Sequence, residues 1–116
     1  MSTAQDLEQI ELQIEDAKKK VARRQMLLRL EQNQDFKELI QKGFLEDHAV
    51  RQVLLKAHPG MQSEAVQQML NQQITAIGGF KQFLIQVNLE GYNAEEDLVN
   101  DEATQEELLN ENLTNG

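Results

Sequence analysis

Residues 63–90, SEAVQQMLNQQITAIGGFKQFLIQVNLE, contain the most regular hydrophobic pattern in this chain of 116 residues. Alternating steps of four and three residues connect Val66, Leu70, Gln73, Ile77, Phe80, Leu84 and Val87. Side chains at this spacing share one face of an α-helix, and a sustained repeat of this kind is typical of a coiled-coil seam. The stretch therefore predicts one long helix, with Gly91 as its C-cap.

Two adjacent glycines, Gly78 and Gly79, fall inside this predicted helix. Each costs about 1 kcal/mol relative to alanine in a helix interior. We expect the helix to continue through them, with another helix packed closely against it at this point.

A second heptad pattern occupies the N-terminal segment, from about residue 3 to residue 33. It consists of Leu7, Ile14, Val21 and Leu28 at seven-residue intervals, with Ile10, Ala17 and Arg24 three residues after the first three. Arg24 is the charged exception in this seam. A helix of this length, roughly 45 Å at 1.5 Å per residue, cannot bury the stripe on itself. We expect either the rest of the chain or another copy to cover it.

The segment between the two long helices predicts a short-helix elbow. Asp35 and Glu38 are spaced as a capping pair for a helix over residues 36–42, which we expect Gly43 to end. A broad apolar face over residues 44–57 predicts a further helix. His58-Pro59-Gly60 predicts a turn, because a proline disfavours the helical conformation in the residue before it.

The net charge of −9 is concentrated at the C-terminal end. Residues 90–116 contain nine Asp and Glu and no Lys or Arg, which leaves 11 acidic and 11 basic residues in residues 1–89. Capping pairs predict two short helices, over about 94–100 and 105–110, followed by disordered last residues. We therefore divide the chain into a helical hairpin domain, residues 1–90, and an acidic C-terminal segment, residues 91–116.

The predicted fold is all-α: a long antiparallel helical hairpin with a short-helix elbow and an acidic, partly helical C-terminal tail. With only five aromatic residues, four Phe and one Tyr, we expect association to contribute to burial. The residues predicted to form the helix seam or an interface are Leu7, Ile10, Ile14, Val21, Val66, Leu70, Ile77, Phe80, Leu84 and Val87.

Composition and motifs argue against several classes of function. The chain has no cysteine, which excludes disulfides and thiolate sites. Neither histidine has the spacing of a zinc motif, and no nucleophile or phosphate-loop motif occurs. We therefore expect no enzymatic activity, no metal and no cofactor. The negative charge argues against direct binding of nucleic acid or an anionic membrane, and no apolar run is long enough for a membrane span.

The one basic cluster comprises Lys18, Lys19, Lys20, Arg23 and Arg24. Acidic residues one turn earlier can pair with it, so it can be a solvated helix face. It can also be a charged docking patch for an acidic partner, including the tail of another copy, or contact phosphate. The acidic tail likewise leaves three interpretations open: solubility, docking on a partner, or imitation of a phosphate backbone.

Residues 24–57, RQMLLRLEQNQDFKELIQKGFLEDHAVRQVLLKA, resemble small helical proteins encoded among the head and structural genes of tailed bacteriophages. The matching pieces are Asn33/Phe36/Lys37, Gly43-Phe44-Leu45 and Ala49-Val50-Arg51-Gln52-Val53-Leu54, and later Gln72-Gln73-Ile74, Ile77-Gly78 and the tail from Glu90. The resemblance implies a component of the virion or of its assembly, and it implies no active-site residues.

Two functional hypotheses follow. The first is a structural or assembly protein of a tailed phage, located in the virion or the host cytoplasm, that associates with itself and with phage structural proteins. The alternative is an acidic regulator that binds a host protein such as a nucleic-acid-processing enzyme. Deletion of residues 91–116 should leave self-association intact under the first hypothesis and abolish partner binding under the second.

Overall fold

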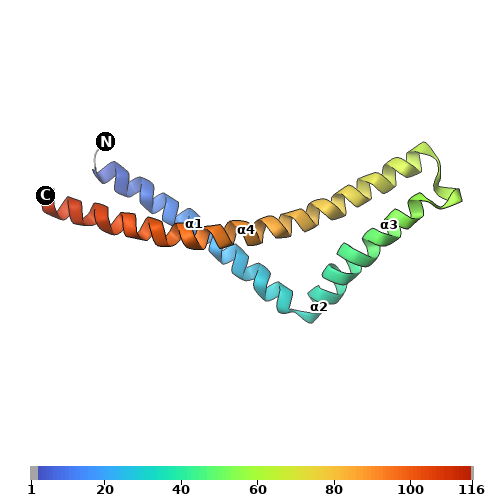
Figure 1. The fold of residues 1–116 in the computed structure, drawn as a ribbon, viewed down its shortest axis with the longest axis horizontal. Helices are drawn as coiled ribbons and strands as arrows, with labels where there is room; N and C mark the ends of the chain where they lie inside the picture. Colours follow the sequence, from blue (N-terminus) through green and yellow to red (C-terminus); the bar gives the residue numbers. More distant parts are fainter. Residues whose placement is uncertain (1–2, 116) are drawn as a thin grey trace. The chain divides into compact units, whose positions relative to one another are not determined.

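A computed structural model describes residues 3–115, and every regular element among them is helical (Figure 1). In chain order they are α1 (Thr3–Gln32), α2 (Gln34–Phe36), the π-helical stretch η1 (Lys37–His48), α3 (Ala49–Lys56), the 3-10 turn η2 (Pro59–Met61) and α4 (Glu64–Asn115). The predicted all-α helical hairpin is therefore confirmed.

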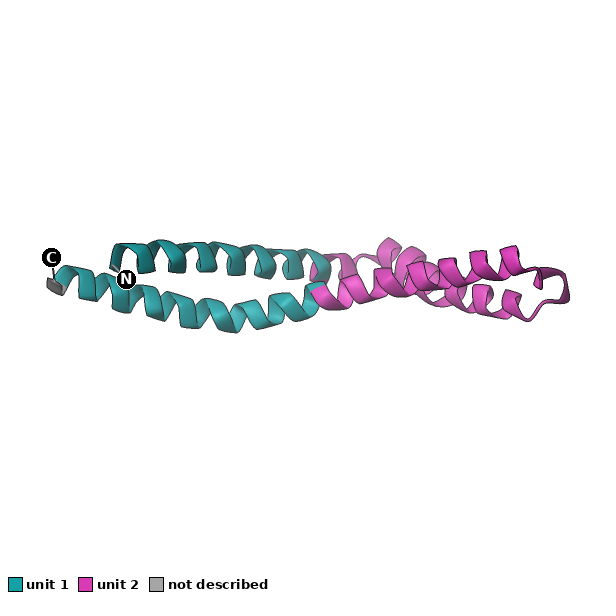
Figure 2. Ribbon diagram, turned by 90° about the horizontal axis from the view of Figure 1, so that it is seen from above, with its two compact units in different colours: residues 1–27, 87–116 teal, residues 28–86 magenta. Residues whose placement is uncertain are grey.

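The contacts within the chain define two compact units, which Figure 2 distinguishes by colour. Unit 1 comprises the described residues up to Leu27 and from Val87 onward, and unit 2 comprises residues 28–86. The acidic C-terminal segment thus shares a unit with most of α1. This grouping differs from the predicted division into residues 1–90 and 91–116.

Helix α4 runs without a break from Glu64 to Asn115. The predicted helix end at Gly91, the two separate short helices and the disorder before Gly116 are therefore wrong; Gly116 itself lies outside the described residues. The physical reason is that the four-and-three repeat does not stop at Val87. It continues through positions that are all buried or half-buried, namely Gly91, Ala94, Leu98, Asp101, Gln105 and Leu108.

The elbow in unit 2 begins at an N-cap. The Asn33 side chain accepts a hydrogen bond from the Phe36 amide at 3.0 Å, so Asn33, and not Asp35, starts the helix. The predicted end at Gly43 is also wrong, because the helix continues through it into α3. In the wider π-helical turn, a Cβ on Gly43 would lie 3.0 Å from the Glu38 carbonyl oxygen. Glycine fits this crowded position without a left-handed conformation.

The turn at Pro59 is confirmed. Helix α3 ends at Lys56, and His58 has the extended backbone that the following proline favours, with φ −68° and ψ 130°. The Gln67 side chain donates to the carbonyl oxygens of Lys56 at 3.0 Å and Met61 at 2.8 Å. The first bond satisfies a carbonyl group at the end of α3 and the second one at the end of η2, so together they join α3 and the turn to the start of α4.

The buried hydrophobic side chains of the described residues lie on the two long helices. They are Ile10, Ile14, Ala17 and Leu27 on α1 and Leu70, Ile77, Val87 and Ala94 on α4. The polar side chain of Gln52 on α3 is also buried. In unit 1, α1 and α4 run antiparallel and cover each other's seams, so the chain itself covers the N-terminal stripe (Figure 1). The register shifts at the end of unit 1, where Leu27 is buried and the predicted seam residue Leu28 is 40% exposed.

Candidate functional site

The most specific contact between α1 and α4 centres on Arg24 and Gly91. Arg24 Nε donates to Asn88 Oδ1 at 2.9 Å, and its Nη1 forms an ion pair with Glu95 Oε1 at 3.0 Å. The guanidinium carbon also lies 5.8 Å from the centre of the Tyr92 ring, within the range of a cation–π contact. The charged exception of the α1 seam therefore has three partners on α4.

Gly91 makes this arrangement possible because it has no side chain. A Cβ at Gly91 would overlap the Cβ of Arg24, and it would lie 2.9 Å from both the Arg24 Cδ and the Lys20 carbonyl oxygen. The stem of Arg24 thus fills the space beside the Gly91 backbone. No such approach occurs at Gly78 and Gly79, where a Cβ would meet nothing within 4 Å. The predicted close packing at those two glycines is therefore wrong.

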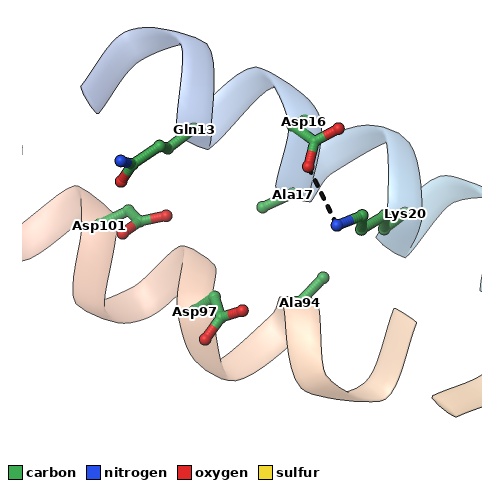
Figure 3. Close-up of a pocket in the computed structure, with 7 residues that line it drawn as sticks. All are labelled: Gln13, Asp16, Ala17, Lys20, Ala94, Asp97 and Asp101. Atoms are coloured by element: carbon green, nitrogen blue, oxygen red, sulfur yellow. Dashed lines mark ion pairs between the residues drawn. The ribbon is translucent and has the colours of Figure 1, made fainter. Parts of the chain in front are cut away.

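One turn further along, small residues face each other between the helices. Figure 3 shows Ala17 of α1 and Ala94 of α4 pointing toward one another, with polar side chains around them. The surrounding cleft has a volume of about 260 Å³ and is lined by Gln13, Asp16, Ala17, Lys20, Ala94, Asp97 and Asp101. This volume is below the range of roughly 300–1,000 Å³ that is usual for small-molecule sites.

Lys20 balances the acidic groups beside this cleft. Its Nζ lies 3.1 Å from Asp16 Oδ2, and this hydrogen-bonded ion pair raises the pKa of Lys20 above its usual value near 10.5. The charges of Glu90 and Asp97 on α4 act in the same direction. Because the pKa is raised on folding, the stabilisation is present below the unfolded pKa and is lost only as pH rises through the folded value. Lys20 is therefore a permanent cation near neutral pH.

The structure divides the predicted basic cluster. Lys20 and Arg24 are half-buried and face the acidic half of α4, whereas Lys18, Lys19 and Arg23 are exposed. The Lys19 Nζ lies 3.7 Å from Glu15 on its own helix. Arg24 therefore joins the two helices, Lys20 pairs with Asp16 on its own helix within the field of Glu90 and Asp97 of α4, and the other three residues are directed to the surface of unit 1.

The predicted seam residues are mostly occupied by packing within the chain. Ile10, Ile14, Leu70, Ile77 and Val87 are buried, and Leu7, Val21, Val66 and Leu84 are half-buried. Phe80 is the exception, being 38% exposed with one edge against the Phe44 ring at 6.0 Å between centroids. A partner would therefore meet other apolar side chains first.

Apart from the apolar face of α3, which the sequence indicated, those side chains lie on faces that sequence reasoning missed. Among the described residues, the outer faces of the helices expose Leu12 and Met26 on α1, Val50, Val53 and Leu54 on α3, and Leu89, Tyr92, Val99 and Leu113 on α4. The signal was present as a second repeat on α4, because Tyr92, Val99 and Leu113 are separated by multiples of seven residues. The pattern of the inner seam is more regular, so sequence analysis detects it first and the second repeat is overlooked.

Unit 2 also contains an open apolar groove of about 580 Å³ along α3. It is lined by the apolar side chains of Val50, Leu54 and Leu55, by the charged side chains of Glu46, Asp47 and Arg51, and by His58.

No protein family, curated protein or solved structure matches this chain. Among residues 3–115, no cluster of three or more His, Cys, Asp or Glu side chains could hold a metal ion. No helix in this part of the chain has the length and apolar character that a membrane span requires.

Proposed function

We propose that this protein is a non-enzymatic structural or assembly protein that acts through helix-mediated association, as a component of a tailed-phage virion or of its assembly pathway. Its partners are further copies of the chain and phage structural proteins. The phage assignment is supported by the resemblance of residues 24–57. The association is supported by the surface of the helices.

The observation that carries the proposal is the distribution of apolar side chains. Among the described residues, 17 large apolar side chains are exposed, whereas only eight hydrophobic side chains are buried. Isolated exposed apolar residues are common, but contiguous ones mark interaction sites in a folded protein. Here they recur along the same helix faces, so association would bury surface that this chain leaves in water.

The arrangement of polar groups supports a binding role more than a catalytic one. The polar cluster with the shortest contacts between α1 and α4, namely Arg24 with Asn88 and Glu95, holds the two helices together. The cleft beside Lys20 is small and lined by three carboxylates, one amide, two alanines and Lys20 itself. The Lys20 amine lies beside the Asp16 carboxylate, but the raised pKa of Lys20 keeps the amine protonated, and a protonated amine is not a nucleophile.

The proposal is tested by measuring mass in solution and composition in particles. Light scattering and sedimentation over a wide concentration range should show a mass that rises above 13.3 kDa. Mass spectrometry of purified particles, compared with the lysate of the source, should detect the protein at a fixed copy number. A monomer at all concentrations would refute self-association, and absence from particles and their assembly intermediates would refute the virion role.

The alternative of an acidic regulator remains a proposal with its own test. The structure changes that test, because residues 91–116 include Gly91 and Ala94, which cover α1 in unit 1. Their deletion would uncover the α1 seam and confuse loss of binding with loss of folding. Reversal of exposed charges at Glu106 and Glu107 is cleaner, since it should abolish binding of a host protein while leaving helix content unchanged.

A further inference from the structure

We propose that two copies of this protein associate by antiparallel packing of the outer face of α1 in one copy against the outer face of the acidic half of α4 in another. The outer stripe of α1 is Leu12, Lys19, Ala22 and Met26. The outer stripe of α4 is Val99, Ala103, Glu106 and Leu113. This inference rests on the proposed self-association and identifies the surfaces that carry it.

The outer stripe of α1 lies on the side of the helix away from α4. Leu12, Lys19 and Met26 are seven residues apart, nearly opposite the buried line of Ile10 and Ile14. Leu12 is 62% exposed and Met26 is 53% exposed, while the side chain of Lys19 is 72% exposed. Two apolar side chains thus flank a cation along one exposed line.

The outer stripe of α4 has the corresponding composition with the opposite charge. Val99 is 68% exposed and Leu113 is 81% exposed, with exposed Ala103 and Glu106 between them. Of these positions, only Ala103 lies nearly opposite the inner seam positions Ala94 and Leu98, and Val99, Glu106 and Leu113 lie on the adjoining flank of the helix, roughly 80–120° from the seam. The stripe on α4 therefore has an apolar side chain at each end and the anionic side chain of Glu106 between them.

The two stripes match when they run in opposite directions. Leu12, Lys19, Ala22 and Met26 are separated by steps of 7, 3 and 4 residues, and Leu113, Glu106, Ala103 and Val99 by the same steps in reverse. Over these 14 residues, both stripes extend about 21 Å. Each layer then pairs like with like or opposite charges: Leu12 with Leu113, Lys19 with Glu106, Ala22 with Ala103, and Met26 with Val99.

Charge and size favour the antiparallel orientation over the parallel one. The antiparallel register places Glu15 at the level of Asn110, which carries no charge. The parallel register would place Glu15 at the level of Glu102, which repels it, and would offset Ala22 from Ala103.

The geometry also determines how association continues. Within unit 1 the stripe of α1 lies opposite the shared seam and the stripe of α4 lies mainly on the flank of its helix, so the two stripes of one copy do not form a single continuous surface. The contact therefore joins two different surfaces, which is a heterologous interface that leaves a binding surface at each end. We expect the mass to grow with concentration beyond a dimer, unless the rotation between copies closes a ring.

A charge exchange tests the contact. Lys19→Glu places two anions against each other in every contact between copies, and Glu106→Lys places two cations there. Each variant alone should therefore need at least a several-fold higher concentration to associate. An equimolar mixture should associate like the wild type, because every contact between the two variants then joins one acidic and one basic side chain. Met26→Asp should raise the half-association concentration about tenfold. Leu54→Asp, which places the same charge on a similarly exposed apolar site of α3, is the matched control and should have no effect.

Cysteine trapping tests the orientation, because the chain has no native cysteine. A mixture of Met26→Cys and Val99→Cys copies should form disulfide-linked heterodimers, whereas a mixture of Leu12→Cys and Val99→Cys should not. Trapping only in the second mixture would overturn the antiparallel register. Two outcomes would show that the two stripes are not the interface while leaving the proposed function intact, provided that the wild type associates. In the first, the mixture of Lys19→Glu and Glu106→Lys does not recover wild-type association. In the second, only Leu54→Asp weakens association. A wild type that never associates refutes both.

Discussion

Replacement of Gly91 by alanine gives the sharpest test of how α1 and α4 pack. In an isolated helix this change should stabilise, since glycine costs about 1 kcal/mol relative to alanine in a helix interior. In this chain the new methyl group would overlap the Arg24 Cβ and lie 2.9 Å from the Lys20 carbonyl oxygen. Ordinary contacts between carbon atoms lie at about 3.5–4.0 Å. The two helices must therefore separate, because neither atom is the free end of a flexible side chain.

The size of the effect follows from two opposing terms. Overpacking of a well-fitted interface costs about 1–3 kcal/mol. The gain in helix propensity, about 1 kcal/mol, cancels the cost at the lower end of this range and offsets only part of it above that. Gly78→Ala supplies the matched control, since a methyl group there would meet nothing within 4 Å and should stabilise by the full propensity term. The difference between the two variants therefore isolates the overpacking cost.

Thermal unfolding followed by circular dichroism, at one fixed protein concentration, measures this difference. For a domain of about 100 residues, 1 kcal/mol corresponds to about 4–8 °C in Tm. We expect Gly78→Ala to melt above the wild type and Gly91→Ala to melt below Gly78→Ala by at least about 4 °C, the lower limit for a 1 kcal/mol difference. If the two alanine variants melt at the same temperature, α1 does not approach α4 at Gly91 and the account of this interface is wrong.

Three further changes test other parts of the fold. Arg24→Ala should lower the free energy of unfolding by about 1 kcal/mol. A double-mutant cycle of Arg24→Ala with Glu95→Ala, measured by urea unfolding, should give a coupling energy of about 0.5–1 kcal/mol, because both side chains are partly exposed. A coupling energy of zero would mean that this ion pair contributes nothing to stability. Ile77→Asp places a charge at a position that is 4% exposed, so it should lower the free energy of unfolding by several kcal/mol and remove much of the helical circular-dichroism signal. An unchanged melting temperature would show that Ile77 is not buried. Asn33→Ala removes the N-cap and should lower the free energy of unfolding in urea by about 1 kcal/mol. Asn33→Asp retains a hydrogen-bond acceptor and should lower it by less. Equal losses in the two variants would argue against capping by Asn33.

The acidic segment has two physical roles in this structure. Its inner carboxylates, including Glu95, lie beside the basic side chains of α1 and stabilise the helix pair. Its outer residues, including Glu106, remain exposed and are available for the proposed contact between copies. A single charged segment can thus serve folding and association because successive residues of a helix face different directions.

Much of the secondary structure could be predicted from local pattern. The four-and-three repeats place helices at α1 and at the first half of α4, and Pro59 restricts His58 enough to set the turn between α3 and α4. Both depend on forces within a few residues, namely side-chain periodicity and backbone sterics. The burial of Ile14, Leu70 and Ile77 follows from the same repeats, because a stripe on a helix must be covered by something.

The amino-acid sequence by itself determined that this chain is helical, where its sharp turn lies and which lines of side chains would be buried. Only the tertiary structure decided what Gly91 does, because a glycine after a repeat is equally suited to end a helix or to admit a neighbouring one. That choice depends on Arg24, 67 positions earlier in the chain, whose stem fills the space and whose guanidinium reaches Asn88 and Glu95. Local propensity carries no information about an approach between residues so distant, and the pairing of the acidic segment with α1 follows from it.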